Sequence, residues 1–287
     1  MKERSLIAFT LLSQMAVGAF WTLGAVYVWI VWQAPVAIAD ELTTPALLAI
    51  GPVMACAMLA SFFHLGTPAN AWRAFANLRS SWLSREILFA ALFAVASVLL
   101  AGMQWLKLGT FAARSVVAGA AALMGLALMV SMSNSYRLRT VPAWDTWITP
   151  VSFLATALLL GGLAVSVALA VDSNAAPELA RSALRGIALA VAVGGGVEVL
   201  VIVLWLIRLA SGAQAAKSAF ARITQKQGLI LTVRQGLLVA GIGVASLAVS
   251  PVRETQAGIV ILAFALVLIS QVLGRVLFYE ARVRQGV

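Results

Sequence analysis

Long apolar runs limit what this chain can fold into. A helix needs about 20 apolar residues to cross a bilayer, and eight stretches meet this length. They are Leu6–Trp32, Pro45–Phe63, Ile87–Leu106, Arg114–Ser133, Pro150–Val171, Ala183–Ile207, Leu229–Val249 and Ala257–Tyr279. Only 10% of the 287 residues are charged, against roughly a quarter in soluble proteins. We therefore expect an all-α integral membrane protein, a bundle of eight transmembrane helices that forms a single domain over residues 1–287.

Basic residues gather on one side of this expected bundle. An even number of spans places both termini on the same side, together with loops 64–86, 134–149 and 208–234. Counting Arg275, in the last turn of the eighth span, that side carries 15 basic and four acidic residues, whereas the other side carries five of each. The positive-inside rule then places the basic side, with both termini, in the cytoplasm. The net charge of +10 is dispersed, which favours a membrane surface or an acidic partner subunit over nucleic acid.

The sequence has one histidine, His64, and one cysteine, Cys56. One histidine cannot supply a haem held by two histidines, nor a metal site made of several. A lone cysteine cannot form an internal disulfide or a Cys-x-x-Cys metal clip. We therefore expect neither haem nor a metal site within this protein.

His64 ends the second expected span, and Glu86 begins the third. Ser84 is expected to cap that third helix, with Glu86 in its first turn. Neighbouring spans joined by a short loop pack side by side, so both groups should lie at one membrane level. A histidine that titrates near neutral pH and an interfacial carboxylate can hydrogen-bond a quinone and carry its protons. The plainer interpretations are a loop hydrogen bond for His64 and a helix-dipole interaction for Glu86.

Two loops on the basic side carry further candidates. The segment Ala69–Leu78, which contains Arg73, has the pattern of a short helix lying in the membrane interface. In the loop after the fourth span, Tyr136, Arg137 and Arg139 are candidates to contact a quinone head group or a partner protein. The alternative for these arginines is ordinary solvated loop charge.

Three features concern the bundle itself. Glu198 is the only acid inside an expected span, which suits either a proton relay or a protonated carboxyl bonded to a neighbouring helix. Leu209–Gly228 has the pattern of an amphipathic interfacial helix. Glycine patches such as Gly161-Gly162 should let helices approach closely.

Four motifs in order give the chain a family resemblance. They are His64-Leu-Gly-Thr-Pro68, Leu83-Ser-Arg-Glu-Ile87, Tyr136-Arg-Leu-Arg-Thr-Val-Pro-Ala-Trp144 and Leu273-Gly-Arg-Val-Leu-Phe-Tyr279. Together they resemble the DmsC family, the membrane anchor subunits of dimethyl-sulfoxide-reductase-type molybdoenzymes. The resemblance runs across the whole sequence.

The resemblance implies a haem-free anchor that reacts with quinone but does not itself convert the substrate. Menaquinone and ubiquinone both remain open. Molybdopterin and iron–sulfur clusters would be held only by the partners, a molybdopterin catalytic subunit and an iron–sulfur electron-transfer subunit. The quinone-site histidine and acid of the family match His64 and Glu86. Arg73, Tyr136 and Arg137 would position the quinone head or dock the iron–sulfur subunit.

The charge pattern bears on which relatives this chain is most like. In dimethyl sulfoxide reductases of the family the catalytic subunits lie outside the membrane, whereas in the sulfite dehydrogenase type they stay in the cytoplasm. A basic side that includes His64 favours the second arrangement, in a bacterial inner membrane. The direction of electron flow, and thus a role such as anaerobic respiration, stays open. A small-solute transporter and a purely structural tether are the alternative functions.

Overall fold

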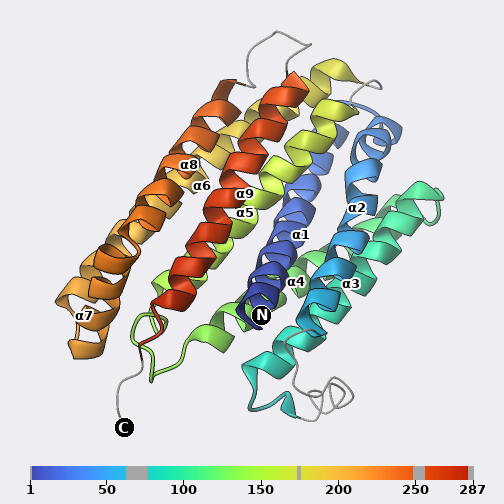
Figure 1. Cartoon of the computed structure of the whole chain (residues 1–287). Coiled ribbons are helices and arrows are strands. Elements are labelled where there is room, and N and C mark those ends of the chain that lie inside the picture. Colours follow the sequence, from blue (N-terminus) through green and yellow to red (C-terminus); the bar gives the residue numbers. More distant parts are fainter. Residues whose placement is uncertain (1, 63–76, 173–175, 248–255, 284–287) are drawn as a thin grey trace.

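The computed structural model describes residues 2–62, 77–172, 176–247 and 256–283. Within these ranges, eight helices are long and apolar enough to cross a membrane, which confirms the expected fold class. They are α1 (Lys2–Val31), α2 (Val36–Phe62), α3 (Trp82–Trp105), α4 (Phe111–Tyr136), α5 (Ile148–Val171), α6 (Pro177–Ser211), α8 (Gly228–Leu247) and α9 (Gln256–Glu280). A short helix, α7 (Gln214–Ala221), and a π-helical turn over Arg222–Lys226 connect α6 to α8 (Figure 1).

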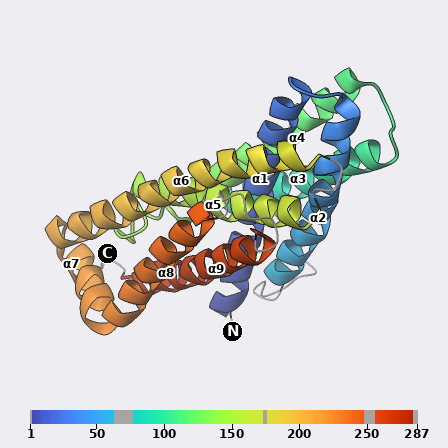
Figure 2. The same cartoon turned by 90° about the horizontal axis from the view of Figure 1, so that it is seen from above.

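Helices α1 and α5 form the centre of the bundle, and glycines let them meet. A methyl group added to Gly18 would overlap the Ala157 carbonyl, and one added to Gly161 would overlap the backbone of α1 at Gly18 and Ala19. The backbones therefore cross in direct contact, as the glycine pattern predicted. Seen from above, α2, α3 and α4 lie to one side of this pair, and α6 to α9 lie to the other (Figure 2).

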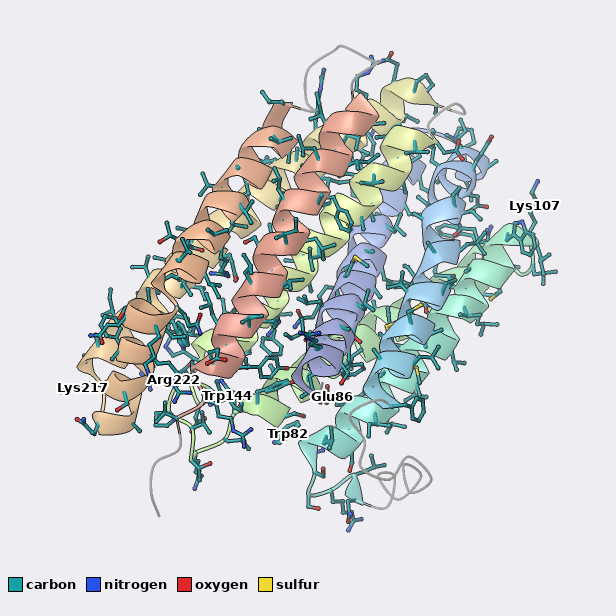
Figure 3. The ribbon with its side chains drawn as sticks, in the orientation of Figure 1. Trp82, Glu86, Lys107, Trp144, Lys217 and Arg222 are labelled. Atoms are coloured by element: carbon teal, nitrogen blue, oxygen red, sulfur yellow. The ribbon has the colours of Figure 1, made fainter. Side chains whose placement is uncertain are left out.

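The two ends of the bundle carry different segments. Helix α1 begins and α9 ends at the same end, where α7 and the α4–α5 connection also lie (Figure 1). Trp82, Glu86, Trp144, Lys217 and Arg222 all lie toward this end, and Lys107 lies at the other (Figure 3). We call these two ends of the bundle the Glu86 end and the Lys107 end. The start of α1 and the end of α9 share the Glu86 end, as expected for an even number of spans.

Helix α3 begins earlier than the sequence suggested. Its N-cap is Ser81, whose side chain accepts a hydrogen bond from the Ser84 backbone N–H at 3.2 Å. The prediction of Ser84 as the cap was wrong, because Trp82 and Leu83 already belong to the helix and supply its first turn. Glu86 therefore lies inside the helix, where it is 3% exposed.

Helix α2 also begins earlier, at Val36 in place of the expected Pro45. The polar residues before Pro45 looked like loop, but Asp40 is neutralised inside the fold. Its carboxylate accepts hydrogen bonds from Tyr27 at 3.0 Å and from Arg114 at 2.8 Å. These contacts let a charged residue take part in a membrane helix.

The connection between α6 and α8 confirms the amphipathic prediction. Ala216, Ala219 and Ile223 are buried against the bundle, whereas Lys217 and Arg222 are exposed. Most of the other expected surface helix, Ala69–Leu78, lies outside the described residues.

Candidate functional site

Glu86 lies at the start of α3 with its carboxyl buried against α4. A side-chain hydrogen bond joins it to Ser135, in the last turn of α4. In the described parts of the sequence, no lysine or arginine pairs with it. A buried carboxyl without a counter-ion is costly as an anion. Such a group is suited to holding and releasing a proton.

Two tyrosine hydroxyls lie within electrostatic reach of this carboxyl. Tyr136, the last residue of α4, and Tyr279, near the end of α9, place their hydroxyl oxygens 2.7 Å apart. Electrostatic interactions join both to Glu86, and a side-chain hydrogen bond joins Tyr279 to Thr10 of α1. Four helices thus contribute polar side chains to one place near the Glu86 end.

A buried arginine extends this group toward the membrane interior. Arg275 is 5% exposed, and its guanidinium lies over the Phe153 ring at 3.8 Å. It donates a hydrogen bond of 2.7 Å to the Gln14 side-chain oxygen. Electrostatic interactions connect Arg275 to both tyrosines. We name Glu86, Tyr136, Arg275 and Tyr279 the buried polar cluster.

Aromatic packing closes one side of the cluster. The Trp144 ring stacks on Phe278 with centroids 5.1 Å apart and planes 11° apart. The indole N–H donates to the Phe278 carbonyl at 2.7 Å. Tyr136 packs edge-on against both rings. The loop after α4 is therefore fixed against the end of α9, which holds the tyrosine pair in place.

A second polar group lies deeper, between α6 and α8. Glu198 and Arg234 form an ion pair of 2.5 Å in which both side chains are almost fully buried. The pair lines a cavity of about 60 Å³ together with Gln271 and Arg275. Among the described residues, the Nε atom of Arg234 and the amide nitrogen of Gln271 find no hydrogen-bond partner. The cavity is large enough for a few water molecules, which would satisfy these donors.

The structure brings together some predicted site residues and leaves others apart. Glu86 and Tyr136 belong to one cluster. Arg137 points elsewhere: it is exposed and lies 3.6 Å from the Asp145 carboxylate. His64 and Arg73 lie outside the described residues.

Sequence reasoning missed Arg275 and Tyr279 as members of the cluster. Arg275 was counted among the charges of the cytoplasmic side because it comes near the end of an apolar run. The signal available was the spacing of four residues between Arg275 and Tyr279, which puts both on one face of a helix. The partner of Glu198 was also missed, because Arg234 was counted with the loop charges.

These features define a multi-pass helical membrane protein with a buried polar cluster at one end. The model of the DMSO reductase anchor subunit (DmsC) family matches residues 1–280. The protein belongs to this family, which confirms the resemblance seen in the sequence and makes it a membrane anchor within an oxidoreductase complex.

Individual relatives agree with this assignment. The sequence is 30% identical over 292 residues to YnfH, an anaerobic dimethyl sulfoxide reductase chain of Escherichia coli, covering 99% of this protein and 96% of the relative. It is 29% identical over 177 residues to a chain of the anaerobic dimethyl sulfoxide reductase of Haemophilus influenzae, covering 60% of each. A segment of 45 residues, 14% of each protein, is 53% identical to a subunit of the sulfite dehydrogenase of Allochromatium vinosum.

Proposed function

We propose that this protein is the quinone-reactive anchor of a molybdopterin/iron–sulfur oxidoreductase complex. It exchanges electrons between membrane quinone and a docked iron–sulfur subunit, which in turn serves a molybdopterin catalytic subunit. Family membership and the relatives named above support this role. The anchor itself holds the quinone, and the partners hold the metals.

The observation that carries the proposal is the burial of Glu86 at one end of the bundle, hydrogen-bonded to Ser135 and within electrostatic reach of Tyr136 and Tyr279. A carboxyl that lacks a counter-cation among the described residues, yet touches Ser135 and neighbours Tyr136, can accept or release a proton without breaking an ion pair. Reduction of a quinone takes up two protons with its two electrons, and oxidation of the quinol releases them. The cluster suits this chemistry in either direction.

Each site residue has a proposed role. His64 comes two residues after the end of α2 in the sequence. Its side chain hydrogen-bonds to one quinone oxygen and exchanges a proton with it. Glu86 relays that proton to the aqueous side, and Tyr136 helps to orient the quinone head. Arg73 and Arg137 position the head or dock the iron–sulfur subunit, and the exposure of Arg137 favours docking.

The orientation is proposed from charge. The Glu86 end is the side predicted to carry most of the basic residues. We therefore place this end and both termini on the cytoplasmic side of a bacterial inner membrane. The catalytic subunit then faces the cytoplasm, as expected for a substrate such as sulfite with menaquinone or ubiquinone as acceptor. Reporter fusions at residue 287 and in the loop after α3 test this placement, since only the first should report a cytoplasmic location.

The test of function uses the whole complex purified in mild detergent from its native membranes. We expect molybdenum or tungsten with many irons per anchor and no haem absorbance. His64→Ala and Glu86→Gln should abolish turnover linked to quinone while leaving turnover with an artificial electron carrier and the attachment of partners intact. Glu178→Gln is the matched control, because this acid is exposed in the first turn of α6, far from the Glu86 end.

Two results would contradict the proposal. Unchanged quinone-linked turnover in His64→Ala would remove the site assignment. A preparation without metal or partner subunits would favour the alternative function, a small-solute transporter. Uptake of solute by the reconstituted protein would then be measured.

A further inference from the structure

One corner of the bundle, where α7 joins α6 to α8, carries a group of exposed cations. Helix α7 and the π-helical turn after it connect these two helices at the Glu86 end, on the periphery of the bundle (Figures 1 and 2). The exposed cations of this connection and of the last turn of α6 are Arg208, Lys217, Arg222 and Lys226. We name these four residues the basic corner. Figure 3 shows two of them, Lys217 and Arg222, at this place.

The protein does not balance the charge of the basic corner. Residues 199–253 contain no aspartate or glutamate. Within the described residues none of the four cations forms an ion pair, whereas Arg137, an exposed cation of the same end, lies 3.6 Å from the Asp145 carboxylate. Arg222 donates to a backbone carbonyl, that of Glu280, at 3.5 Å. The basic corner thus presents unbalanced positive charge, which attracts an anion.

Exposed apolar side chains fix the depth of the basic corner in the membrane. On α6, Val203 and Ile207 are 46% and 58% exposed one turn apart, and the next residue is Arg208. On α8, Leu229 is 79% exposed, three residues after Lys226. In a bundle of membrane helices such side chains face the hydrocarbon, and long basic side chains beyond them reach into the head-group region. The basic corner therefore lies at the level of the phospholipid head groups.

Helix α7 lies along this interface with its cations turned outward. Its apolar side chains Ala216 and Ala219, together with Ile223 of the π-helical turn, are buried against the bundle. Lys217 and Arg222 are exposed on the other side. A helix with this division lies in the plane of the interface, where its basic face is attracted to anionic lipid. Because the apolar face is already covered, α7 attracts a ligand through its charge.

Charge and depth together select the occupant. Anionic phospholipids carry the negative charge of a membrane surface, and each nearby lysine or arginine strengthens the attraction. Both side chains form charge-assisted hydrogen bonds with phosphate oxygens. The tails of a phospholipid also cover Ile207 and Leu229, which an acidic protein docked from the aqueous side leaves exposed. We propose that the basic corner binds the phosphate head group of an anionic phospholipid, whose tails lie along the adjoining faces of α6 and α8.

This site is separate from the function proposed for His64 and Glu86. It uses none of the residues of the buried polar cluster, and it lies on the opposite side of the α1–α5 pair from α2, α3 and α4 (Figure 2). The bound lipid holds the connection between α6 and α8 at the membrane surface, with no part in electron transfer required of it.

The experiment is photolabelling in phosphatidylcholine nanodiscs that contain a minor fraction of phosphatidylglycerol with a photoreactive head group, followed by peptide mapping. It is carried out on the purified complex and on the full-length anchor alone. We expect label on residues 208–229 in both preparations, and little label there from phosphatidylcholine that carries the same photoreactive group. The label should decrease as salt is added, because salt screens exposed charges.

Variants test the cations themselves, with phosphatidylglycerol affinity measured by native mass spectrometry of the full-length protein. Lys217→Gln, Arg222→Gln and Lys226→Gln should each lower this affinity about fivefold, as expected for one cation near a membrane surface, and their combination should lower it further. Arg222→Lys keeps the charge and should keep the affinity. Arg79→Gln is the matched control, because Arg79 is an exposed cation at the same end of the bundle that precedes α3; it should bind the lipid as the unchanged protein does.

Four results would overturn the proposal. They are no label on residues 208–229, equal label from phosphatidylcholine, unchanged affinity in the triple variant, and label on this segment in the isolated anchor but not in the complex. The last result would show that a partner subunit, and not lipid, covers the basic corner. Thermal unfolding of each variant detects misfolding, and Arg208→Gln combined with Lys226→Gln then serves as a second test that leaves α7 unchanged.

Discussion

The hydroxyl oxygens of Tyr136 and Tyr279 lie 2.7 Å apart, although 143 residues separate them in the sequence. This contact joins the end of α4 to the end of α9. It also brings together two of the four motifs on which the sequence resembles the DmsC family, because Trp144 of one stacks on Phe278 of the other. The motifs are therefore parts of one structure at the Glu86 end, and the tyrosine pair is its polar centre.

Tyr279→Phe tests whether this pair supports the quinone site. The ring packing is retained, but Tyr136 loses its hydroxyl partner. The lost hydrogen bond is worth about 1 kcal/mol of net free energy. Because Tyr279 acts by positioning Tyr136, we expect quinone-linked turnover of the complex to fall roughly fivefold, the same energy expressed as a rate. Turnover with an artificial electron carrier should not change. Ser246→Ala, which removes a hydroxyl bonded to its own helix, is the control; an equal loss in both variants would contradict a role for the pair.

Arg275→Lys tests the arginine of the cluster. Lysine keeps the positive charge but cannot reproduce the guanidinium plane over Phe153 or its hydrogen bond to Gln14 at the same reach. We expect thermal stability of the purified complex to fall and quinone-linked turnover to drop with it. Arg208→Lys, at the end of α6 where the residue is exposed, should change neither. A fully stable Arg275→Lys complex would show that the stacked geometry is dispensable.

The sequence predicted the helices well because the bilayer imposes length and hydrophobicity on each of them. It predicted the positions of single polar groups less well. Asp40 was assigned to a loop, and Arg234, in the first turns of the seventh expected span, was counted with the charges of the basic side. A charged residue indicates the end of a membrane helix as long as its partner is unknown. Those partners, Arg114 and Glu198, lie far away in the sequence. Glu86 was placed correctly on α3, but its neighbours Tyr136 and Tyr279 depend on how α3, α4 and α9 pack.

Glu198→Ala tests the ion pair between α6 and α8. Removing the acid leaves the Arg234 guanidinium buried and uncompensated, which costs about 3–5 kcal/mol. We expect a strongly lowered unfolding temperature in detergent and poor accumulation in the membrane. Replacing both members, Glu198→Gln with Arg234→Met, should recover most of the stability because neither charge of the pair remains. If the double variant were as unstable as Glu198→Ala, the effect would come from packing and not from the unpaired cation.

Gly161→Ala tests the contact at the centre of the bundle. A methyl group at this position would overlap the backbone of α1 at Gly18, and backbone cannot move aside as a flexible side chain can. The two helices must separate, so we expect the free energy of unfolding to fall by about 1–3 kcal/mol, the usual cost of overpacking. Separation of α1 also moves Thr10 and Gln14, which contact the buried polar cluster, so quinone-linked turnover should fall together with stability. Gly186→Ala is the control, because a methyl group there meets open space. Unfolding temperature and turnover measured on both variants decide the matter, and a Gly161→Ala complex that matches the control in both would show that α1 and α5 do not need to touch.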